Sequence, residues 1–263
     1  MNPVRAVILD MDGVLWRGNR PLAGLQELFV TLERRSLPAV IATNNATIEP
    51  ASIVARLKEA GVLFPPGNVV TSANAAAAHI GRSFPAGVRV HVVGEEPLRA
   101  ALAKAGCRIV DGADRPEAVV VGMDRKLDWE KLTQATLAIR AGAVLIGTNP
   151  DLTFPSERGI GPGNGAVLAA LEAATGTAPT VVGKPEPHLF LEAARRLAVE
   201  AAHCLVVGDR LETDILGGLR AGMPTALLLT GVTSREAMEA SDIPPDVVLE
   251  DLPELSAWLS IWE

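Results

Sequence analysis

The chain has 263 residues, of which 48% are hydrophobic and 21% are charged. This length excludes a single short module, and the composition is that of a globular protein rather than of a disordered or collagen-like chain. Lysine and arginine total 24 against 31 aspartates and glutamates, a net charge of -7. Because nucleic acid and anionic lipid bind basic surfaces, we expect neither a nucleic-acid nor a membrane partner.

The cysteines and the N-terminus indicate the compartment. Cys107 and Cys204 have no second cysteine or histidine at metal-ligand spacing, so we expect both to be reduced. The first apolar run, residues 4–9, is too short for a secretory signal and ends in Asp10. No apolar run approaches the ~20 residues of a membrane helix. We therefore predict a cytoplasmic protein.

Short β-branched runs alternate with longer amphipathic segments, a pattern typical of parallel strands joined by crossover helices. At the two ends of the chain we predict strands at residues 4–9, 38–42, 202–208, 225–229 and 246–249. Helices are predicted near residues 22–35, 49–60, 187–198 and 214–221. The predicted fold class is α/β, with a Rossmann-like parallel sheet in the core domain.

The middle of the chain contains enough elements for a second core. Strands are predicted at residues 88–93, 108–110, 118–122 and 144–147, and helices at 96–105, 129–140 and 166–174. The glycine-rich residues 159–165 are expected to form a loop. Glycine and proline near residues 83–87 and 176–179 mark the boundaries. We thus predict a core domain at 1–83 and 179–263 with a smaller α/β cap inserted at 84–178.

Polar side chains follow the predicted core strands. Asp10 and Asp12 follow the first strand, Thr43 follows the second and Asp209 follows the third. Each alone would be read as a turn or helix-cap residue. In a parallel sheet, however, the carboxyl ends of the strands share one edge, and converging carboxylates are costly without a cation. Oxygen ligands without histidine or cysteine favour Mg²⁺.

Lys184 lies between Gly183 and Pro185, before a predicted helix. A single lysine is usually a solvated surface charge. Together with Mg²⁺, however, this lysine would supply positive charge for a phosphoryl group, and Thr43 would supply a hydrogen-bond donor.

Four ordered motifs carry a family resemblance: Asp-Met-Asp-Gly-Val at 10–14, Thr-Asn-Asn at 43–45, Gly-Lys-Pro at 183–185 and Gly-Asp-Arg-Leu-Glu-Thr-Asp at 208–214. They resemble those of the haloacid dehalogenase superfamily of phosphohydrolases. The insertion, with Gly-Thr-Asn-Pro-Asp at 147–151, is similar to the large α/β cap (class IIA) of its NagD-like and 4-nitrophenylphosphatase branch. The resemblance covers nearly the whole chain.

The resemblance implies an aspartyl-phosphate mechanism. Asp10 would be the nucleophile, and Asp12 would protonate the leaving oxygen and then deprotonate the attacking water. Asp10, the main-chain carbonyl of Asp12 and Asp209 would hold Mg²⁺. Asp214 would support the metal from the second shell or through water.

The resemblance also implies where the substrate binds. Thr43 and the amide of Asn44 would hold the phosphoryl oxygens, and Lys184 would offset their charge. Asp151 and Phe154, in the segment that resembles the family's recognition loop, would contact the leaving group. The cap is also the candidate surface for a homodimer.

The expected function is Mg²⁺-dependent hydrolysis of a small phosphorylated metabolite. A nucleotide, sugar phosphate, pyridoxal phosphate, phosphoglycolate or aryl phosphate would fit, and the sequence does not choose among them. Two alternatives stay open: a phosphotransferase that uses the same aspartyl-phosphate, and a non-catalytic phosphate-binding module. The presence of both Asp10 and Asp12 counts against the second.

Overall fold

The computed structural model describes residues 2–156 and 159–261. Contacts divide the chain into two compact units, and each is described by itself. The core unit comprises Met1–Thr43, Pro50–Val70 and Lys184–Glu263, and the inserted unit comprises Asn44–Glu49 and Thr71–Gly183. Among the described residues, every helix is too short or too polar to span a bilayer.

A six-stranded sheet in the order β15-β14-β13-β1-β4-β5 organises the core unit. Its strands are β1 (Ala6–Leu9), β4 (Ala39–Thr43), β5 (Val69–Thr71), β13 (Cys204–Gly208), β14 (Thr225–Leu228) and β15 (Val247–Leu249). β1 pairs in parallel with both β13 and β4. The central strands are fully buried, which explains why they read as continuous apolar runs rather than alternating ones.

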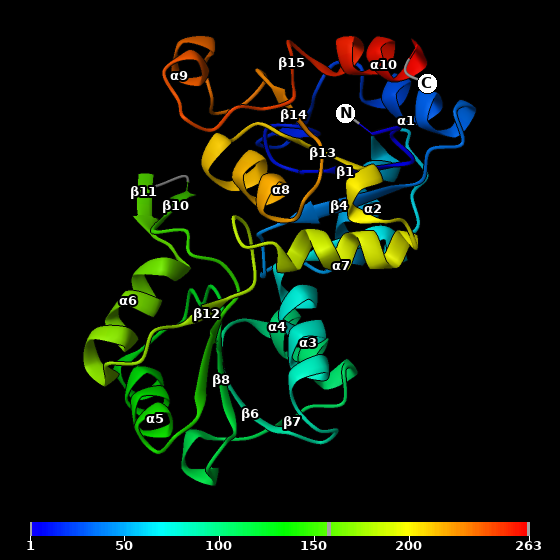
Figure 1. The fold of residues 1–263 in the computed structure, drawn as a ribbon. Helices are drawn as coiled ribbons and strands as arrows, with labels where there is room; N and C mark the ends of the chain where they lie inside the picture. The colour runs from blue at the N-terminus through cyan, green and yellow to red at the C-terminus, as the bar shows by residue number, and fades with distance from the viewer. Residues whose placement is uncertain (1, 157–158, 262–263) are drawn as a thin grey trace. The chain divides into compact units, whose positions relative to one another are not determined.

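Helices surround this sheet (Figure 1). They are α1 (Leu25–Arg34), α2 (Pro50–Glu59), α7 (His188–Leu197), α8 (Leu216–Arg220), α9 (Arg235–Glu239) and α10 (Leu252–Ile261). α7 packs against β1 and β4, while α1 packs against α10. A short hairpin of β2 (Trp16–Arg17) and β3 (Arg20–Pro21) follows β1.

The inserted unit contains a five-stranded parallel sheet in the order β12-β9-β8-β6-β7. Its strands are β6 (Arg89–Val93), β7 (Arg108–Ile109), β8 (Ala118–Val121), β9 (Val144–Gly147) and β12 (Thr180–Val181). Figure 1 shows α5 (Trp129–Arg140) and α6 (Asn164–Thr175) on one side, and α3 (Ser72–Ser83) and α4 (Glu96–Lys104) on the other. Both units therefore confirm the predicted α/β fold class.

The inserted unit is larger than the predicted 84–178. Helix α3 packs against α4, so this unit begins again at Thr71 rather than at residue 84. At the other end, β12 pairs with β9 and extends the unit to Gly183. Neither extension has a strong local signal, because α3 is a run of small residues and β12 has only two residues.

The prediction of a loop at 159–165 was wrong. Residues Gly159–Pro162 form β11, which pairs with β10 (Thr153–Ser156) in an antiparallel hairpin. The following helix, α6, begins at Asn164, two residues earlier than predicted. Glycine content indicates a turn, but here the pairing with β10 determines the conformation.

Candidate active site

Three carboxylates converge at the carboxyl ends of β1 and β13. Asp10 follows β1, and its amide donates to the carbonyl of Val207 on β13 at 2.9 Å. Asp209 follows β13, and Asp214 lies on the helical turn Leu211–Ile215. Oxygens of Asp10, Asp209 and Asp214 all lie within 4.8 Å of one another, and all three residues are buried. The prediction that Asp10 and Asp209 lie together at one sheet edge is confirmed, and Asp214, expected from the family resemblance to support the metal, lies beside them.

Lys184 joins this cluster. Its Nζ donates to Oδ1 of Asp214 at 2.6 Å and also to Oδ1 of Asp10, and the lysine side chain is only 3% exposed. Burial acts to lower the pKa of Lys184, but the two carboxylates outweigh it and raise that pKa above its ordinary value. Lys184 is therefore a buried, permanently charged ammonium group.

The four side chains of the cluster are not balanced in charge, because three carboxylates face one ammonium group. Burial raises the pKa of Asp10 well above its ordinary value and, with Asp214 next, raises that of Asp209 to about 6. Oδ2 of Asp209 accepts from the amide of Val232 at 2.7 Å. Oδ1 of Asp209 is buried and has no hydrogen-bond partner among the described residues. A buried carboxylate oxygen without a donor is a position for a cation, and the all-oxygen set fits Mg²⁺.

Gly13 allows the backbone after β1 to lie in close contact with the side chain of Asp209. It has a φ of 90°, and a Cβ there would lie 2.5 Å from Cγ and 2.9 Å from Oδ1 of Asp209. Any other residue would push the carboxylate away or strain the turn. The sequence signal for this role was the glycine directly after Asp12.

The side chain of Asp12 is exposed to solvent and lies outside the three-carboxylate cluster. Its main chain forms an isolated β-bridge with Trp16. The side chain reaches solvent on one side, but the protein around it removes much of its contact with water. This partial burial raises the pKa of Asp12. Arg56, Lys184 and Arg210 act in the opposite direction. An exposed carboxyl group whose pKa is raised suits proton transfer to a group arriving from solvent.

Thr43 is the last residue of β4, which pairs with β1, and Asn44 follows it. Thr43 is buried. The side-chain amide of Asn44 donates to Oδ2 of Asp151 at 3.4 Å, and its carbonyl accepts from Ser72 Oγ at 2.6 Å and from Asn149 Nδ2 at 2.9 Å. This hydrogen bond places Asp151, which was predicted to contact the substrate, next to Asn44. The sequence analysis missed Ser72 and Asn149, although Asn149 lies in the Gly-Thr-Asn-Pro-Asp segment.

Phe154 lies on β10 opposite Gly161 and is 38% exposed. Ile160, on the paired strand β11, is 80% exposed. The hairpin therefore presents apolar side chains to solvent, as a recognition loop would. The assignment of Phe154 to substrate contact stays a prediction.

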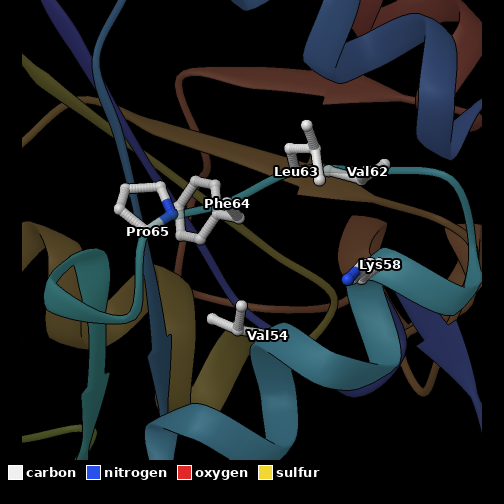
Figure 2. A pocket seen from close by; sticks show the side chains of 6 residues that line it. All are labelled: Val54, Lys58, Val62, Leu63, Phe64 and Pro65. Atoms are coloured by element: carbon white, nitrogen blue, oxygen red, sulfur yellow. The ribbon is translucent and has the colours of Figure 1, made fainter.

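A separate hollow of about 290 Å³ lies in the core unit between α2 and the segment after it (Figure 2). Its lining residues are Val54, Lys58, Val62, Leu63, Phe64 and Pro65. Phe64 also packs edge-on against Phe29, with ring centroids 5.4 Å apart. None of the predicted site residues lines this hollow, so it is distinct from the carboxylate cluster.

Comparison with known proteins identifies a matching family and relatives of similar length. Residues 7–108 match the family described as haloacid dehalogenase-like hydrolase, and residues 181–255 match one described as HAD-hydrolase-like. An acid sugar phosphatase of Staphylococcus aureus is 36% identical over 98% of this chain and 99% of its own length.

Solved structures are similar over the whole fold. A p-nitrophenyl phosphatase from Archaeoglobus fulgidus is 34% identical, with a TM-score of 0.92 over 98% of this chain and 100% of that one. A glycerol phosphate phosphatase from Mycobacterium tuberculosis, in complex with magnesium, is 39% identical, with a TM-score of 0.89 over 98% of this chain and 78% of that one.

Proposed function

The chain belongs to the haloacid dehalogenase-like hydrolases, and from this premise we propose that it is a Mg²⁺-dependent phosphatase of small phosphate monoesters that acts through an aspartyl-phosphate. The observation that carries the proposal is the buried cluster of Asp10, Asp209 and Asp214 around Lys184 at the carboxyl edge of the core sheet. Such an edge is where ligands bind in open α/β sheets.

Asp10 is the proposed nucleophile. Lys184 binds Oδ1 of Asp10 and holds the carboxylate in one orientation, so we assign the attack on phosphorus to Oδ2. As the new O–P bond forms, the bond from phosphorus to the ester oxygen breaks. Lys184 stays charged throughout and offsets negative charge on the phosphoryl oxygens.

Asp12 is the proposed acid and base. It gives its proton to the departing ester oxygen, so the product leaves as an alcohol. It then takes a proton from the water that attacks the aspartyl-phosphate, which restores Asp10 and releases orthophosphate. Its exposed position permits exchange of the product alcohol for water.

Asp10, Asp209 and the main-chain carbonyl of Asp12 are the proposed metal ligands, with Asp214 behind them. When bound, Mg²⁺ polarises the phosphoryl group and neutralises charge on its oxygens. The buried Oδ1 of Asp209, which has no protein donor among the described residues, supports this assignment.

The substrate class is a small phosphorylated metabolite. The relatives named above are an acid sugar phosphatase, a p-nitrophenyl phosphatase and a glycerol phosphate phosphatase. We propose that the inserted unit contacts the leaving group through Asp151 and Phe154.

Phosphate release from a panel of sugar, glycerol, nucleotide and aryl monoesters tests the proposal. We expect free orthophosphate with Mg²⁺ and none with excess chelator, and we expect activity to return when Mg²⁺ is restored. Phosphate recovered on an added alcohol instead of water would indicate a phosphotransferase. Binding of phosphate without any turnover would indicate a binding module.

A further inference from the structure

Asn149, two residues after β9, contacts residues close to the points where the chain crosses from one unit to the other. The passages lie at residues 43/44, 49/50, 70/71 and 183/184. Asn44, Ser72 and Gly183 each lie within two residues of one passage, and all three are grouped around Asn149 within the inserted unit. We propose that Asn149 is a positioning residue that fixes the two phosphoryl-binding segments, Thr43–Asn44 and Gly183–Lys184; this inference rests on the proposed function.

The first contact fixes the carbonyl of Asn44. Nδ2 of Asn149 donates to this oxygen at 2.9 Å, and Oγ of Ser72 donates to it at 2.6 Å. A carbonyl oxygen has two lone pairs, so these two donors use its full capacity. Asn149 and Ser72 are both buried, so water does not readily replace either donor. The peptide plane after Asn44 is thereby held from two directions.

The second contact involves Gly183. A Cβ at Gly183 would clash first with the carbonyl oxygen of Thr148, and it would lie 2.6 Å from Oδ1 of Asn44 and 3.2 Å from Cβ of Asn149. The backbone directly before Lys184 therefore packs against Thr148, Asn149 and the side chain of Asn44, and only glycine permits this approach. One asparagine thus touches both segments that carry phosphoryl-binding groups.

Asn149 is itself held in a single orientation. Its Oδ1 accepts from the amide of Asp151 at 3.2 Å, so its Nδ2 must face Asn44. Its carbonyl accepts from Nδ2 of the buried Asn164 at 2.8 Å. The donor that holds Asn44 therefore belongs to a network anchored on β9 and the start of α6.

This arrangement matters because phosphoryl transfer depends on the placement of donors. A misplacement of about 1 Å can cost about 10²-fold in rate. Asn44 carries the proposed phosphoryl-binding amide and is contacted by Asn149 at its own carbonyl, and the backbone of Lys184 follows Gly183, which packs against Asn149. Loss of Asn149 should affect every monoester alike, because the affected groups bind the phosphoryl part that all monoesters share.

The test compares Asn149→Ala and Asn149→Asp with wild type and with Asp128→Ala. Asp128 is an exposed N-cap that accepts from the amide of Lys131 at 2.8 Å at the start of α5, so its loss weakens the same unit without contact to Asn44. Calorimetry measures the Kd of orthophosphate with Mg²⁺ present, and steady-state kinetics measure kcat and KM for two monoesters.

For Asn149→Ala we expect the Kd of orthophosphate to rise about 10-fold and kcat/KM for both monoesters to fall by one common factor of about 10- to 100-fold. Asn149→Asp should lose more, because it places a carboxylate oxygen against the Asn44 carbonyl. Asp128→Ala should keep the wild-type Kd. Ser72→Ala, which removes the other donor, should raise the Kd if Asn149→Ala does not fold.

An unchanged Kd in the folded Asn149 variants, or an equal change in Asp128→Ala, would overturn the inference while leaving the proposed function intact. Unequal factors for the two monoesters would also overturn it, because they would place Asn149 in contact with the leaving group. If wild type binds orthophosphate but hydrolyses no ester, the proposed function fails and the Kd comparison still decides the role of Asn149.

Discussion

The two parallel sheets of this protein differ in how the charges at their carboxyl ends are balanced. At the core edge, three buried carboxylates lie close together, Lys184 pairs with two of them, Asp10 and Asp214, and Asp209 has an oxygen with no donor among the described residues. At the inserted edge, the buried polar residues Thr148, Asn149 and Asn164 are neutral. The carboxylates there are each paired with a cation: Asp124, whose side chain is 5% exposed, with Lys131, and Glu95 with Arg125, whose side chain is 64% exposed.

The comparison shows that the chemistry comes from the edge residues and not from the fold. Buried amides carry no net charge: Asn149 donates to Asn44 and Asn164 donates to Asn149, although Oδ1 of Asn164 has no partner among the described residues. Buried carboxylates at such distances need a cation or a proton. The core edge therefore has an excess of buried negative charge, which the proposed metal would neutralise, whereas the carboxylates Asp124 and Glu95 at the inserted edge are paired with cations.

The largest expected effect comes from removing the nucleophile at the core edge. Asp10→Asn keeps the shape of the side chain but cannot attack phosphorus, so we expect turnover to fall by about 10⁴-fold or more. The melting temperature should confirm that the variant is folded. Phosphate release near the wild-type rate would show that Asp10 is not the nucleophile, and the core edge would then not be distinguished from the inserted edge by its chemistry.

Asp12→Asn tests proton transfer. An amide cannot protonate the ester oxygen, so we expect kcat to fall by about 10²- to 10⁴-fold. The loss should be smaller for an aryl phosphate than for an alkyl phosphate, because a phenolate leaves more readily without a proton. Equal losses for the two esters would count against Asp12 as the acid.

Lys184→Met compares the two edges by stability. It leaves Asp10 and Asp214 buried without their ammonium partner, so we expect the free energy of unfolding to fall by about 3 to 5 kcal/mol. Arg125→Met at the inserted edge removes a solvent-exposed pair and should cost about 1 kcal/mol or less. Urea titrations measure both, and similar losses would contradict the contrast.

Phe154→Ala tests recognition by the inserted unit. We expect the ratio of kcat/KM between an aryl phosphate and glycerol phosphate to change by about 10-fold, which corresponds to ~1.4 kcal/mol. Asp151→Ala should also change this ratio. The control is Ile160→Ala, since Ile160 is exposed on the same hairpin but pairs with Pro155, so successive side chains place it on the opposite face from Phe154. If Phe154→Ala changed kcat/KM by one common factor for all substrates, Phe154 would have no role in substrate recognition.

The smallest expected effect is a change in the pH dependence of stability, and it concerns His91, which is buried on β6. Its Nδ1 lies 3.3 Å from the carbonyl oxygen of Val110, and Nε2 has no partner among the described residues. Burial lowers the pKa of His91, with Arg99 in the same direction and Asp111 opposed.

The unfolded chain, with an ordinary pKa near 6.5, therefore takes up a proton before the folded one. Stability should be full above this pH and decrease as the pH falls below it. His91→Gln should flatten the decrease in urea midpoint between pH 7.5 and pH 5. An unchanged slope would assign the effect to other groups.

Much of the core could be predicted from the sequence. Continuous apolar runs predicted β1, β4 and β13 within two residues, and Asp10 and Asp209, which directly follow β1 and β13, lie close together as expected. Local signals suffice here because a buried parallel strand is apolar throughout and its end is marked by a change to polar residues.

The rest depended on long-range pairing. Strand β12 exists because two residues pair with β9, and β11 exists because glycines pair with β10. The contact of Asn149 with Asn44, which lies 105 residues earlier, leaves no signal in the sequence around either residue. Hydrophobic periodicity does not report such contacts, which explains why α3 and β12 were placed outside the insertion.

The pairing of β1 with β13 sets the order in which a nascent chain can fold. Ala6 aligns with Cys204, and the Asp10–Lys184 pair joins residues 174 apart, so β1 has no partner on its β13 side until most of the protein has been synthesised. The inserted sheet needs only residues up to Val181. A ribosome therefore delivers a complete inserted unit first, while the apolar strand β1 remains half-paired. The cluster of Asp10, Asp209 and Asp214 therefore cannot assemble until Asp214 has been synthesised, after the inserted sheet is complete.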